Sequence, residues 1–338
     1  MTPTLTLALT LALLLLAATG CSRSSGAQTS APSATSPTAT HAGRAEQSTA
    51  YAPYVSASTA HTTDAAGSPS AYNLAFVVAD GDTCTPTWGG HTAIGNATVK
   101  SRIAELSSSD STVRVSFGGA TDKELATTCD SAAGLAAAYA TALDAAGGAT
   151  HADFDIEGDT LTDSASVTLR AKAIALLQKE RDLDVTFTLP VMPAGLDADS
   201  LALLEAANNQ GVQVSTVNLM TMNYGESYDG DMGGYAITAA KAAHAQLTKV
   251  FGSSAAATWQ AMALTSMLGV NDVDGETFTL SDAAQVRAFA EEKSIAWVSA
   301  WATFRDVQCE EGTSTDDAAT NCSGVTQSAG AYAKAFSG

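Results

Sequence analysis

The sequence predicts an α/β fold, and within that class a (β/α)8 TIM barrel with a shortened first βα unit. From about residue 51 onward, short runs of β-forming residues alternate with stretches rich in alanine and leucine. This alternation is typical of a parallel sheet covered by helices. Eight candidate strands can be recognised, and polar or acidic residues follow several of them at the carboxyl end, where such barrels place their active sites.

The candidate strands share β-branched or aromatic residues bounded by turn formers. They are residues 51–56, 72–79, 112–117, 152–157, 184–189, 214–222, 258–264 and 295–301. The candidate helices between them are mostly rich in Ala and Leu, which favour helices. They are residues 134–146, 166–180, 200–208, 234–247 and 281–292.

The first βα unit is expected to be degraded. Only about fifteen residues separate the first two candidate strands, and they include Gly67, Ser68 and Pro69. A connection between parallel strands needs a dozen residues or more when it contains a helix. A complete crossover helix therefore barely fits there.

The amino-terminal residues differ in composition from the rest of the chain. An apolar run over residues 4–19 is followed by Gly20-Cys21, so that Ala18-Thr19-Gly20-Cys21 forms a lipobox. Such a run is typical of a secretory signal and is too short for a membrane span. We therefore expect a signal peptide over residues 1–21, a disordered Ser/Thr/Ala-rich tether over residues 22–48, and the barrel over residues 49–338. The protein would then be extracellular, or anchored to the outer face of the cell membrane through a lipid on Cys21.

Four further cysteines fit an exported protein. Cys84, Cys129, Cys309 and Cys322 are an even number, as expected for disulfides in an oxidising compartment. Zinc is the alternative, but no close pair of cysteines and no histidine cluster accompanies them. Proximity along the chain favours Cys84 with Cys129 and Cys309 with Cys322, although four cysteines allow three pairings.

The formal net charge of −19 and the pI near 4.4 restrict the partners. A chain this acidic repels nucleic acid and anionic membrane surfaces, and we therefore expect neither as a partner. We expect attachment to a membrane only through the lipid. A neutral polysaccharide meets no such repulsion, although solubility alone would also explain the acidity. No calcium-loop spacing and no His-based nucleophile pattern is present, so we expect no metal and no cofactor.

The run from Ala152 to Glu157 contains the candidate catalytic residues. In an extended strand Asp153, Asp155 and Glu157 face one way, while Phe154 and Ile156 face the other. Crowded carboxylates tend to hold a proton, which supplies a general acid for hydrolysis. The alternative is an acidic edge strand that deters aggregation, which the bulky apolar residues on the other face disfavour.

This run resembles the active-site strand of the family 18 glycoside hydrolases, the chitinases and their relatives, whose signature is D-x-x-D-x-D-x-E. The last three acids match Asp153, Asp155 and Glu157, whereas Thr150 takes the place of the first. Other segments resemble this family in the same order along the chain. They are Ser116-Phe117-Gly118-Gly119, residues 218–225 with Met222, Asn223 and Tyr224, residues 267–272, and residues 301–306 with Trp301.

The resemblance implies a retaining mechanism in which the 2-acetamido group of the substrate attacks the anomeric carbon. Glu157 would be the general acid, and Asp155 would hold the acetamido N–H with help from Asp153. Tyr224 would donate to the acetamido oxygen, and we rank it above Asn223. Trp301 would form the floor beneath the reacting sugar, with core packing as the alternative.

The other substrate-binding residues implied by the resemblance are Ser116, Gly118, Met222 and Asn223. The expected function is a secreted or lipid-anchored, monomeric chitinase that hydrolyses chitin or N-acetylglucosamine oligosaccharides. Thr150 and Asn223 keep open a non-catalytic chitin- or glycan-binding lipoprotein. An endo-β-N-acetylglucosaminidase is a further alternative, because the same chemistry serves it.

Overall fold

The computed structural model describes residues 48–108, 111–313 and 321–338. The expected signal peptide, Cys21 and the tether up to residue 47 lie outside the described residues. By compactness the chain divides into residues 1–44 and 45–338, and all the described residues belong to the second unit.

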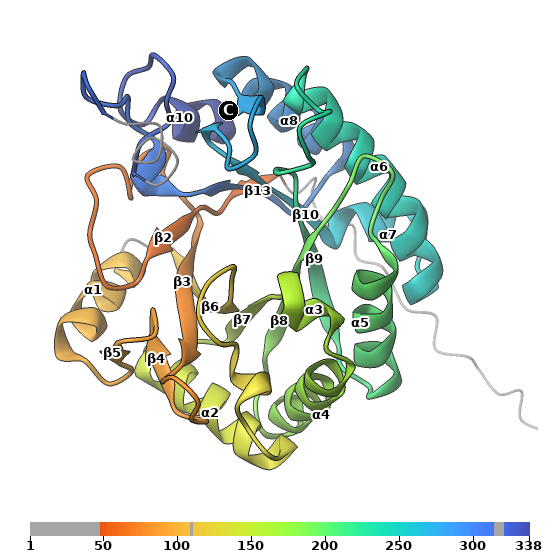
Figure 1. The fold of residues 1–338 in the computed structure, drawn as a ribbon. Coiled ribbons are helices and arrows are strands. Elements are labelled where there is room, and N and C mark those ends of the chain that lie inside the picture. Colours follow the sequence, from red (N-terminus) through yellow and green to blue (C-terminus); the bar gives the residue numbers. More distant parts are fainter. Residues whose placement is uncertain (1–47, 109–110, 314–320) are drawn as a thin grey trace, which may run out of the picture. The chain divides into compact units, whose positions relative to one another are not determined.

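Seven parallel strands follow one another around a barrel, with helices on the outside (Figure 1). Each is hydrogen-bonded to the next in the order given. They are β3 (Ala71–Ala79), β6 (Thr112–Gly118), β7 (His151–Asp155), β8 (Asp184–Pro190), β9 (Val214–Met220), β10 (Met262–Met267) and β13 (Trp297–Trp301).

The eighth position of the barrel is filled by a strand in two pieces. β1 (Ala50–Tyr51) pairs with β13, and β2 (Tyr54–Ser56) pairs with β3, both in parallel. Pro53 lies between the pieces and has no N–H to donate, although its carbonyl still accepts from Asn73 N at 2.9 Å. Residues 50–56 thus lie between β13 and β3 and close the ring of strands. This confirms the predicted (β/α)8 barrel.

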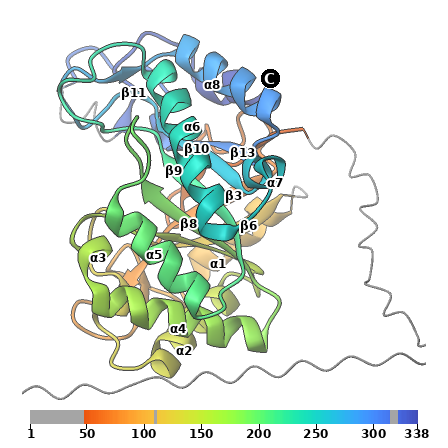
Figure 2. The same ribbon diagram turned by 90° about the vertical axis from the view of Figure 1, so that its right-hand side faces the viewer.

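The helices cover the outer face of the strands, and α4, α5 and α6 lie side by side there (Figure 2). The helices are α1 (Ala97–Ser107), α2 (Ala132–Ala145), α3 (Gly158–Thr162), α4 (Ser164–Glu180), α5 (Ala198–Asn209), α6 (Met232–Phe251), α7 (Ala255–Gln260), α8 (Leu280–Lys293) and α10 (Ala331–Ser337), with short 3-10 turns η1 (Leu125–Thr127) and η2 (Thr303–Arg305). Side-chain caps start most of the long helices, such as Ser131 at α2 and Thr279 with Asp282 at α8.

The structure confirms the degraded first βα unit and corrects the bounds of two predicted strands. No helix connects β2 to β3, so the first βα unit is degraded as expected. The strand expected over residues 258–264 is wrong in its first half: residues 255–260 form α7, and the strand is β10. Ser254 caps that helix by accepting from Ala257 N at 3.2 Å, and the capped turn outweighs the strand preference of Thr258 and Trp259. The strand expected over residues 214–222 ends at Met220.

The two faces of the barrel strands differ in chemistry. Phe117, Phe154 and Phe187 are register partners on β6, β7 and β8. The first two rings stack with centroids 5.3 Å apart, and Phe187 packs tilted against Phe154 at 5.8 Å. The neighbouring residues on these strands face the barrel interior and are polar, among them Ser116, Asp153 and Thr188. Alternation thus places the hydrophobic core outside the barrel and a polar column inside it.

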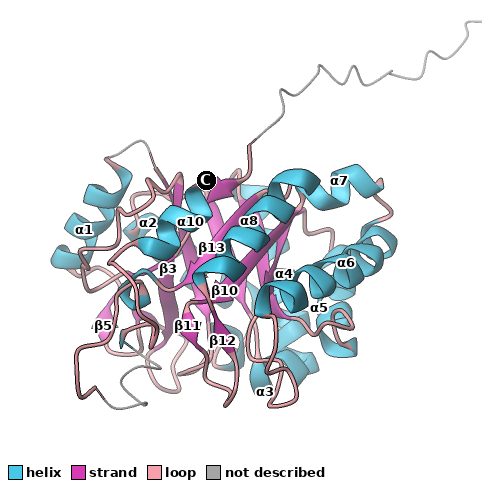
Figure 3. Ribbon diagram, turned by 90° about the horizontal axis from the view of Figure 1, so that it is seen from above, coloured by secondary structure: helices cyan, strands magenta, loops and turns pink. Residues whose placement is uncertain are grey.

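The irregular segments that follow the strands gather at one end of the barrel. The hairpin β4 (Pro86–Trp88) and β5 (Thr92–Ala93), α3, and the hairpin β11 (Gly269–Val270) and β12 (Thr277–Phe278) all lie at the lower end in Figure 3. They follow β3, β7 and β10, so this is the carboxyl end of the strands. None of the described helices is long and apolar enough to cross a membrane.

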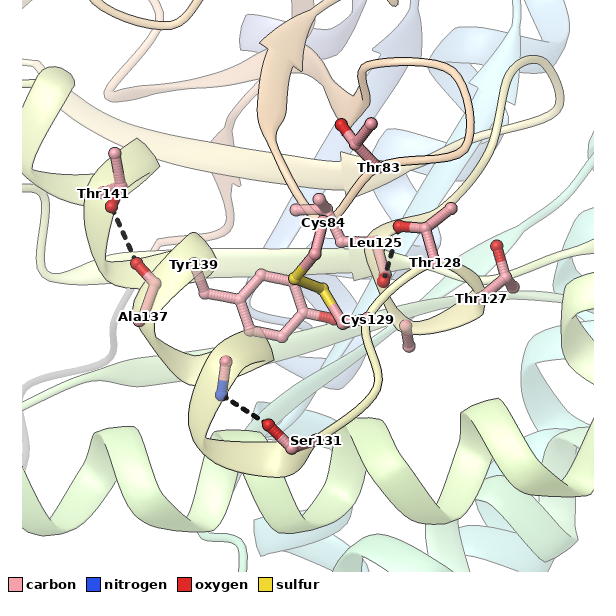
Figure 4. Close-up of a disulfide and its surroundings, with 12 residues drawn as sticks. Thr83, Cys84, Leu125, Thr127, Thr128, Cys129, Ser131, Ala137, Tyr139 and Thr141 are labelled. Atoms are coloured by element: carbon pink, nitrogen blue, oxygen red, sulfur yellow. Dashed lines mark hydrogen bonds between the residues drawn. A yellow bond between two sulfur atoms is a disulfide. The ribbon is translucent and has the colours of Figure 1, made fainter.

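Both expected disulfides are present, which confirms the predicted pairing. Cys84 is bonded to Cys129, and Cys309 to Cys322. The first bond joins the loop after β3 to the segment before α2 and lies beside Leu125 and Tyr139 (Figure 4). It fixes the chain that follows Gly118 and Gly119, next to the acidic strand.

Candidate active site

The three acids lie in one column on β7 and its extension. β7 ends at Asp155, but Glu157 is still extended, with φ −144° and ψ 174°, so the alternation continues. Phe154 and Ile156 are fully buried on the opposite side. Asp153 is therefore deepest in the barrel, Asp155 is next, and Glu157 is at the rim.

Asp153 is held by three hydroxyl donors from three different strands. Tyr54 Oη and Ser116 Oγ donate to its Oδ2 at 2.8 Å and 2.5 Å, and Thr188 Oγ1 donates to its Oδ1 at 2.6 Å. Burial raises the pKa of Asp153, while these hydrogen bonds and the charge of Arg114 act in the opposite direction. A carboxyl group that accepts from three donors is stabilised as the anion.

The network extends across the barrel behind Thr188. Thr265 donates to Asn218 Oδ1 at 2.9 Å, and Asn218 donates to Thr188 Oγ1 at 3.0 Å. Each donor in this chain polarises the next, so the orientation of the Thr188 hydroxyl toward Asp153 is fixed. Strands β8, β9 and β10 thus all contribute to the position of one buried carboxylate.

Asp155 is buried but incompletely satisfied. Its Oδ1 atom has no hydrogen-bond partner among the described residues. Burial, then the charges of Glu157 and Asp153, hold the pKa of Asp155 well above its usual range. A buried acceptor without a partner is unfavourable, so a ligand N–H placed there would be bound strongly.

Two glycines bring the neighbouring strand against this acid. Gly118 and Gly119 have φ of 96° and 90°, and Gly119 N donates to Asp155 O at 2.9 Å. A Cβ at position 118 would lie 2.2 Å from Asp155 O, so no other residue fits at this position without moving β7.

Glu157 is half-buried at the rim and faces a fourth acid. Burial and then the charge of Asp272 raise the pKa of Glu157. Asp272 and Asn223 form two hydrogen bonds with each other. Asn223 Nδ2 donates to Asp272 Oδ2 at 3.3 Å, and Asp272 N donates to Asn223 Oδ1 at 3.2 Å. A carboxyl group that keeps its proton to higher pH is suited to general acid catalysis.

The column opens into a pocket with about 470 Å³ of empty volume. Its residues come from the carboxyl ends of most of the strands. They are Tyr54, Phe76, Ala120, Asp155, Glu157, Thr188, Met220, Met222, Asn223, Thr265, Asp272 and Trp301.

Trp301 forms an aromatic wall of this pocket. It is half-buried, and its ring stacks on Phe76 with centroids 5.4 Å apart and an interplanar angle of 26°, while Tyr54 meets it edge-on at 5.7 Å. One face of the indole is thus supported by Phe76. Such a supported ring is suited to stacking on the apolar face of a sugar.

The three site residues expected after β9 do not all lie at the pocket. Met222 and Asn223 line the pocket, and Asn223 has a left-handed backbone with φ 56°. Tyr224 does not line it: its ring is buried against Tyr228 and Tyr235, with centroids 5.8 Å and 6.2 Å away. Tyr224 was ranked above Asn223, but it is Asn223 that lines the pocket. The reason is that β9 ends at Met220 and the chain turns before residue 224.

Ser116 and Gly118 also lie outside the pocket lining. Ser116 is fully buried and bonds to Asp153, and Gly118 packs against the backbone of Asp155. They support the acids from below, whereas direct contact with a ligand was expected. Thr150, in the place of the first signature acid, is exposed before β7 begins.

A second hollow adjoins the first across Glu157. It has about 650 Å³ of empty volume and shares Glu157, Met220, Met222 and Asn223 with the pocket already described. Pro190, Val191, Met192 and Asp197 form its remaining wall. Met192 is the only large hydrophobic side chain exposed among the described residues. The two hollows form one groove with Glu157 at its middle.

Sequence analysis did not single out Tyr54, Phe76 or Asp272 as site residues. Asp272 ends the segment 267–272, which resembles the family, so its charge in that segment was the available signal. Tyr54 and Phe76 lie in ordinary β-forming runs, and nothing in those runs indicates that they face the acids.

No protein-family model matches the chain. The chain is 34% identical over 277 residues to a probable bifunctional chitinase/lysozyme of Escherichia coli, and 32% identical over 252 residues to endochitinase 11 of Metarhizium anisopliae. These alignments cover 76% and 70% of this chain, but only 31% and 47% of the relatives. The chain thus spans less than half the length of these two relatives.

Solved structures extend the comparison. The catalytic domain of the hyperthermophilic chitinase from Pyrococcus furiosus superposes with a TM-score of 0.75 and 28% identity, covering 86% of this chain and 94% of that one. Mutants of active domain 2 of that chitinase have been solved with chito-oligosaccharides. A GH18 chitinase from Pseudoalteromonas aurantia, with a TM-score of 0.55 and 14% identity, shares the fold.

The sequence relatives and the structural neighbours all carry the name of chitinase. The barrel, the order of the strand-end motifs and the relatives lead to one assignment: the chain belongs to the family 18 glycoside hydrolases.

Proposed function

We propose that this protein hydrolyses β-1,4-linked N-acetylglucosamine polymers, that is, chitin and its oligosaccharides, with retention of configuration. The observation that supports this most is the buried Oδ1 of Asp155, which has no hydrogen-bond partner in the described part of the chain and lies in the same pocket as Trp301. An acetamido N–H is a donor of the kind this oxygen lacks. The chitinases among the relatives support the same substrate.

In the proposed mechanism the 2-acetamido oxygen attacks the anomeric carbon while Glu157 gives its proton to the leaving oxygen. Asp155 accepts the acetamido N–H and balances the positive charge of the oxazolinium ion. Water then opens that ion, and Glu157 takes back a proton. Asp153 stays fixed by Tyr54, Ser116 and Thr188 and supports Asp155 from below.

We propose a place in the groove for each side of the scissile bond. The reacting sugar would lie on Trp301 in the pocket with Asp155, and the leaving-group sugar would lie beyond Glu157, against Pro190 and Met192. We also propose that the protein acts as a monomer, which light scattering of the pure protein tests.

We also propose export and attachment to the outer face of the cell membrane through a lipid on Cys21, after a signal peptide over residues 1–21. The lipobox motivates this, and the two disulfides support an oxidising compartment.

Glu157→Gln tests the function. The amide keeps the shape but removes the transferable proton, so turnover of a fluorogenic chitobioside should fall by about 10²–10⁴-fold. Affinity for chito-oligosaccharides should be retained. A substrate with a leaving group that needs no acid should be hydrolysed by the variant at a rate closer to that of the wild type.

Glu180→Gln is the matched control, since Glu180 is exposed at the end of α4, away from the groove. It should leave turnover unchanged. A wild-type protein that binds chito-oligosaccharides but hydrolyses none of them from acid to neutral pH would overturn the proposal and favour a non-catalytic glycan-binding lipoprotein. Cleavage of N-linked glycans in preference to chitin would favour an endo-β-N-acetylglucosaminidase.

A further inference from the structure

Arg114 places a cation inside the barrel, below the acids. Arg114 on β6 is the only lysine or arginine on the described strands of the ring, β1, β2, β3, β6 to β10 and β13. It is buried, with 7% of its surface exposed. Arg114 is two residues before Ser116, whose register partner across the sheet is Asp153. Since a strand rises about 3.3 Å per residue, its backbone lies about 7 Å below that of Asp153.

Uncharged groups hold the guanidinium of Arg114. Its Nη1 donates to Asn73 Oδ1 at 2.6 Å, and its Cζ lies 4.2 Å from the ring centroid of Trp297. Asn73 Nδ2 is itself bonded to Ala52 O at 2.9 Å. No carboxylate among the described residues lies within ion-pair distance of Arg114. A buried cation without a direct counter-ion is unfavourable, so its compensation must come from charges farther away.

Few titratable groups face this cation. Asp153 and Tyr54 lie above it, while Asp184 and His151 lie toward the amino end of the strands, where they form a pair 3.1 Å apart. Asp184 is mostly exposed, so water screens it. The carboxyl group of Asp153 is buried, so its ionised form interacts more strongly with Arg114 than the screened Asp184 does. Asp155 lies one step further up the column.

The usual acid before β7 is replaced here by Thr150, which is exposed and bonds to His151 Nδ1 at 3.1 Å. The charged side chain below Asp153 on the interior face of β6 is the cation Arg114. Burial lowers the pKa of Arg114. Even so, an arginine remains charged at every pH at which the enzyme would work.

We propose that Arg114 is a positioning residue for the acid pair formed by Asp153 and Asp155. Its buried positive charge fixes one negative charge on Asp153. In this way it sets the lowest pH at which the pair supports activity. With Asp153 ionised, any proton that the pair keeps is on Asp155, which faces the pocket. The inference rests on the proposed function for its activity test, but the ionisation of Asp153 is measurable without turnover.

Three variants separate charge from packing. Arg114→Met and Arg114→Gln remove the charge, so the acid limb of kcat/KM should move to higher pH by roughly one unit, with about tenfold lower kcat/KM below that limb. Arg114→Lys keeps the charge and should leave the limb within a few tenths of a unit of the wild type. The control Arg287→Met removes a buried arginine on α8, far from the acids, and should not move the limb.

A carboxyl ¹³C NMR titration of Asp153, assigned with Asp153→Asn, gives the same information without substrate. Its midpoint should rise in Arg114→Met and Arg114→Gln and stay in Arg114→Lys. Equal midpoints in all folded variants, or an equal shift in Arg114→Lys and Arg114→Met, would overturn the inference. If the wild type shows no hydrolysis, the proposed function fails, while the titration still decides the role of Arg114.

Discussion

At the scale of single residues, burial raises the pKa of both Asp153 and Glu157, and only their other contacts act in opposite directions. Asp153 lies above a cation and accepts three hydrogen bonds, and these contacts favour its ionised form. Glu157 faces Asp272, whose charge favours the protonated form. Environments that separate the protonation of neighbouring carboxyl groups are the means by which one site holds both an anion and an acid.

Asp272→Asn should move the basic limb of kcat/KM to lower pH. A general acid must be protonated, and its activity is lost as the pH rises through its pKa. Asp272 raises the pKa of Glu157, so its neutralisation lowers that pKa and ends activity at lower pH. Because Asp272 is exposed to water, we expect roughly half a unit.

Asp274→Asn is the control for this prediction, since Asp274 is an exposed acid in the same loop but does not line the pocket. Its pH profile should match that of the wild type. A basic limb that is equally displaced in both variants would assign the effect to the charge of the whole loop, and not to Asp272.

Part of the site was predictable at this scale, because strand alternation alone places Asp153, Asp155 and Glu157 on one side. Tyr54 and Phe76 were not predictable in the same way. Tyr54 Oη meets a carboxylate 99 positions away, and that contact depends on the closure of the barrel. Tyr224 fell outside the pocket because the strand before it ends early, and residue spacing contains no information on where a strand stops pairing.

At the scale of elements, the contact between β6 and β7 determines where the acids lie. Gly118→Ala should reduce turnover at least tenfold and lower stability, because its Cβ would lie 2.2 Å from Asp155 O and must displace the backbone of the catalytic strand. Activity of the fluorogenic chitobioside and a thermal melt would be measured together.

Gly147→Ala is matched to this change. Gly147 also has a positive φ, 80°, but no atom lies within 4 Å of the Cβ that would be added. Both variants share the backbone strain of about 1–2 kcal/mol, so only the contact with β7 differs. Retained turnover in Gly118→Ala at a stability equal to that of Gly147→Ala would contradict the role assigned to this contact.

Element prediction succeeded where a strand and its turn signals agreed, as for β6 and β8. It failed in the first half of residues 258–264, where Thr258 and Trp259 are consecutive β-formers but lie in α7. The Thr258 hydroxyl donates to Ser254 O at 3.0 Å, and Ser253 Oγ lies 2.7 Å from Thr258 Oγ1. The hydrogen bonds of this hydroxyl are therefore made within the helical turn. Such local bonding of Thr competes with strand formation and is not visible in the residue pattern.

At the scale of the whole molecule, net charge and the proposed lipid act in opposite directions. A formal charge of −19 leaves no electrostatic attraction to an anionic membrane. Attachment would therefore depend on the acyl chains of Cys21 alone, each of which contributes about 0.8 kcal/mol per buried CH₂. Two or more chains make such an anchor stable.

Cys21→Ser should therefore release the whole protein from the membrane fraction, because nothing else in the charge pattern retains it. High salt should not release the wild type, since salt weakens charge-based attachment and leaves acyl chains in place. Mass spectrometry of the mature wild type should find a diacylglyceryl group on Cys21 as the first residue. Release of the wild type by salt, or a mature chain that begins elsewhere, would contradict the lipid anchor. Neither result would affect the barrel or its acids, because every residue of the site lies beyond residue 50.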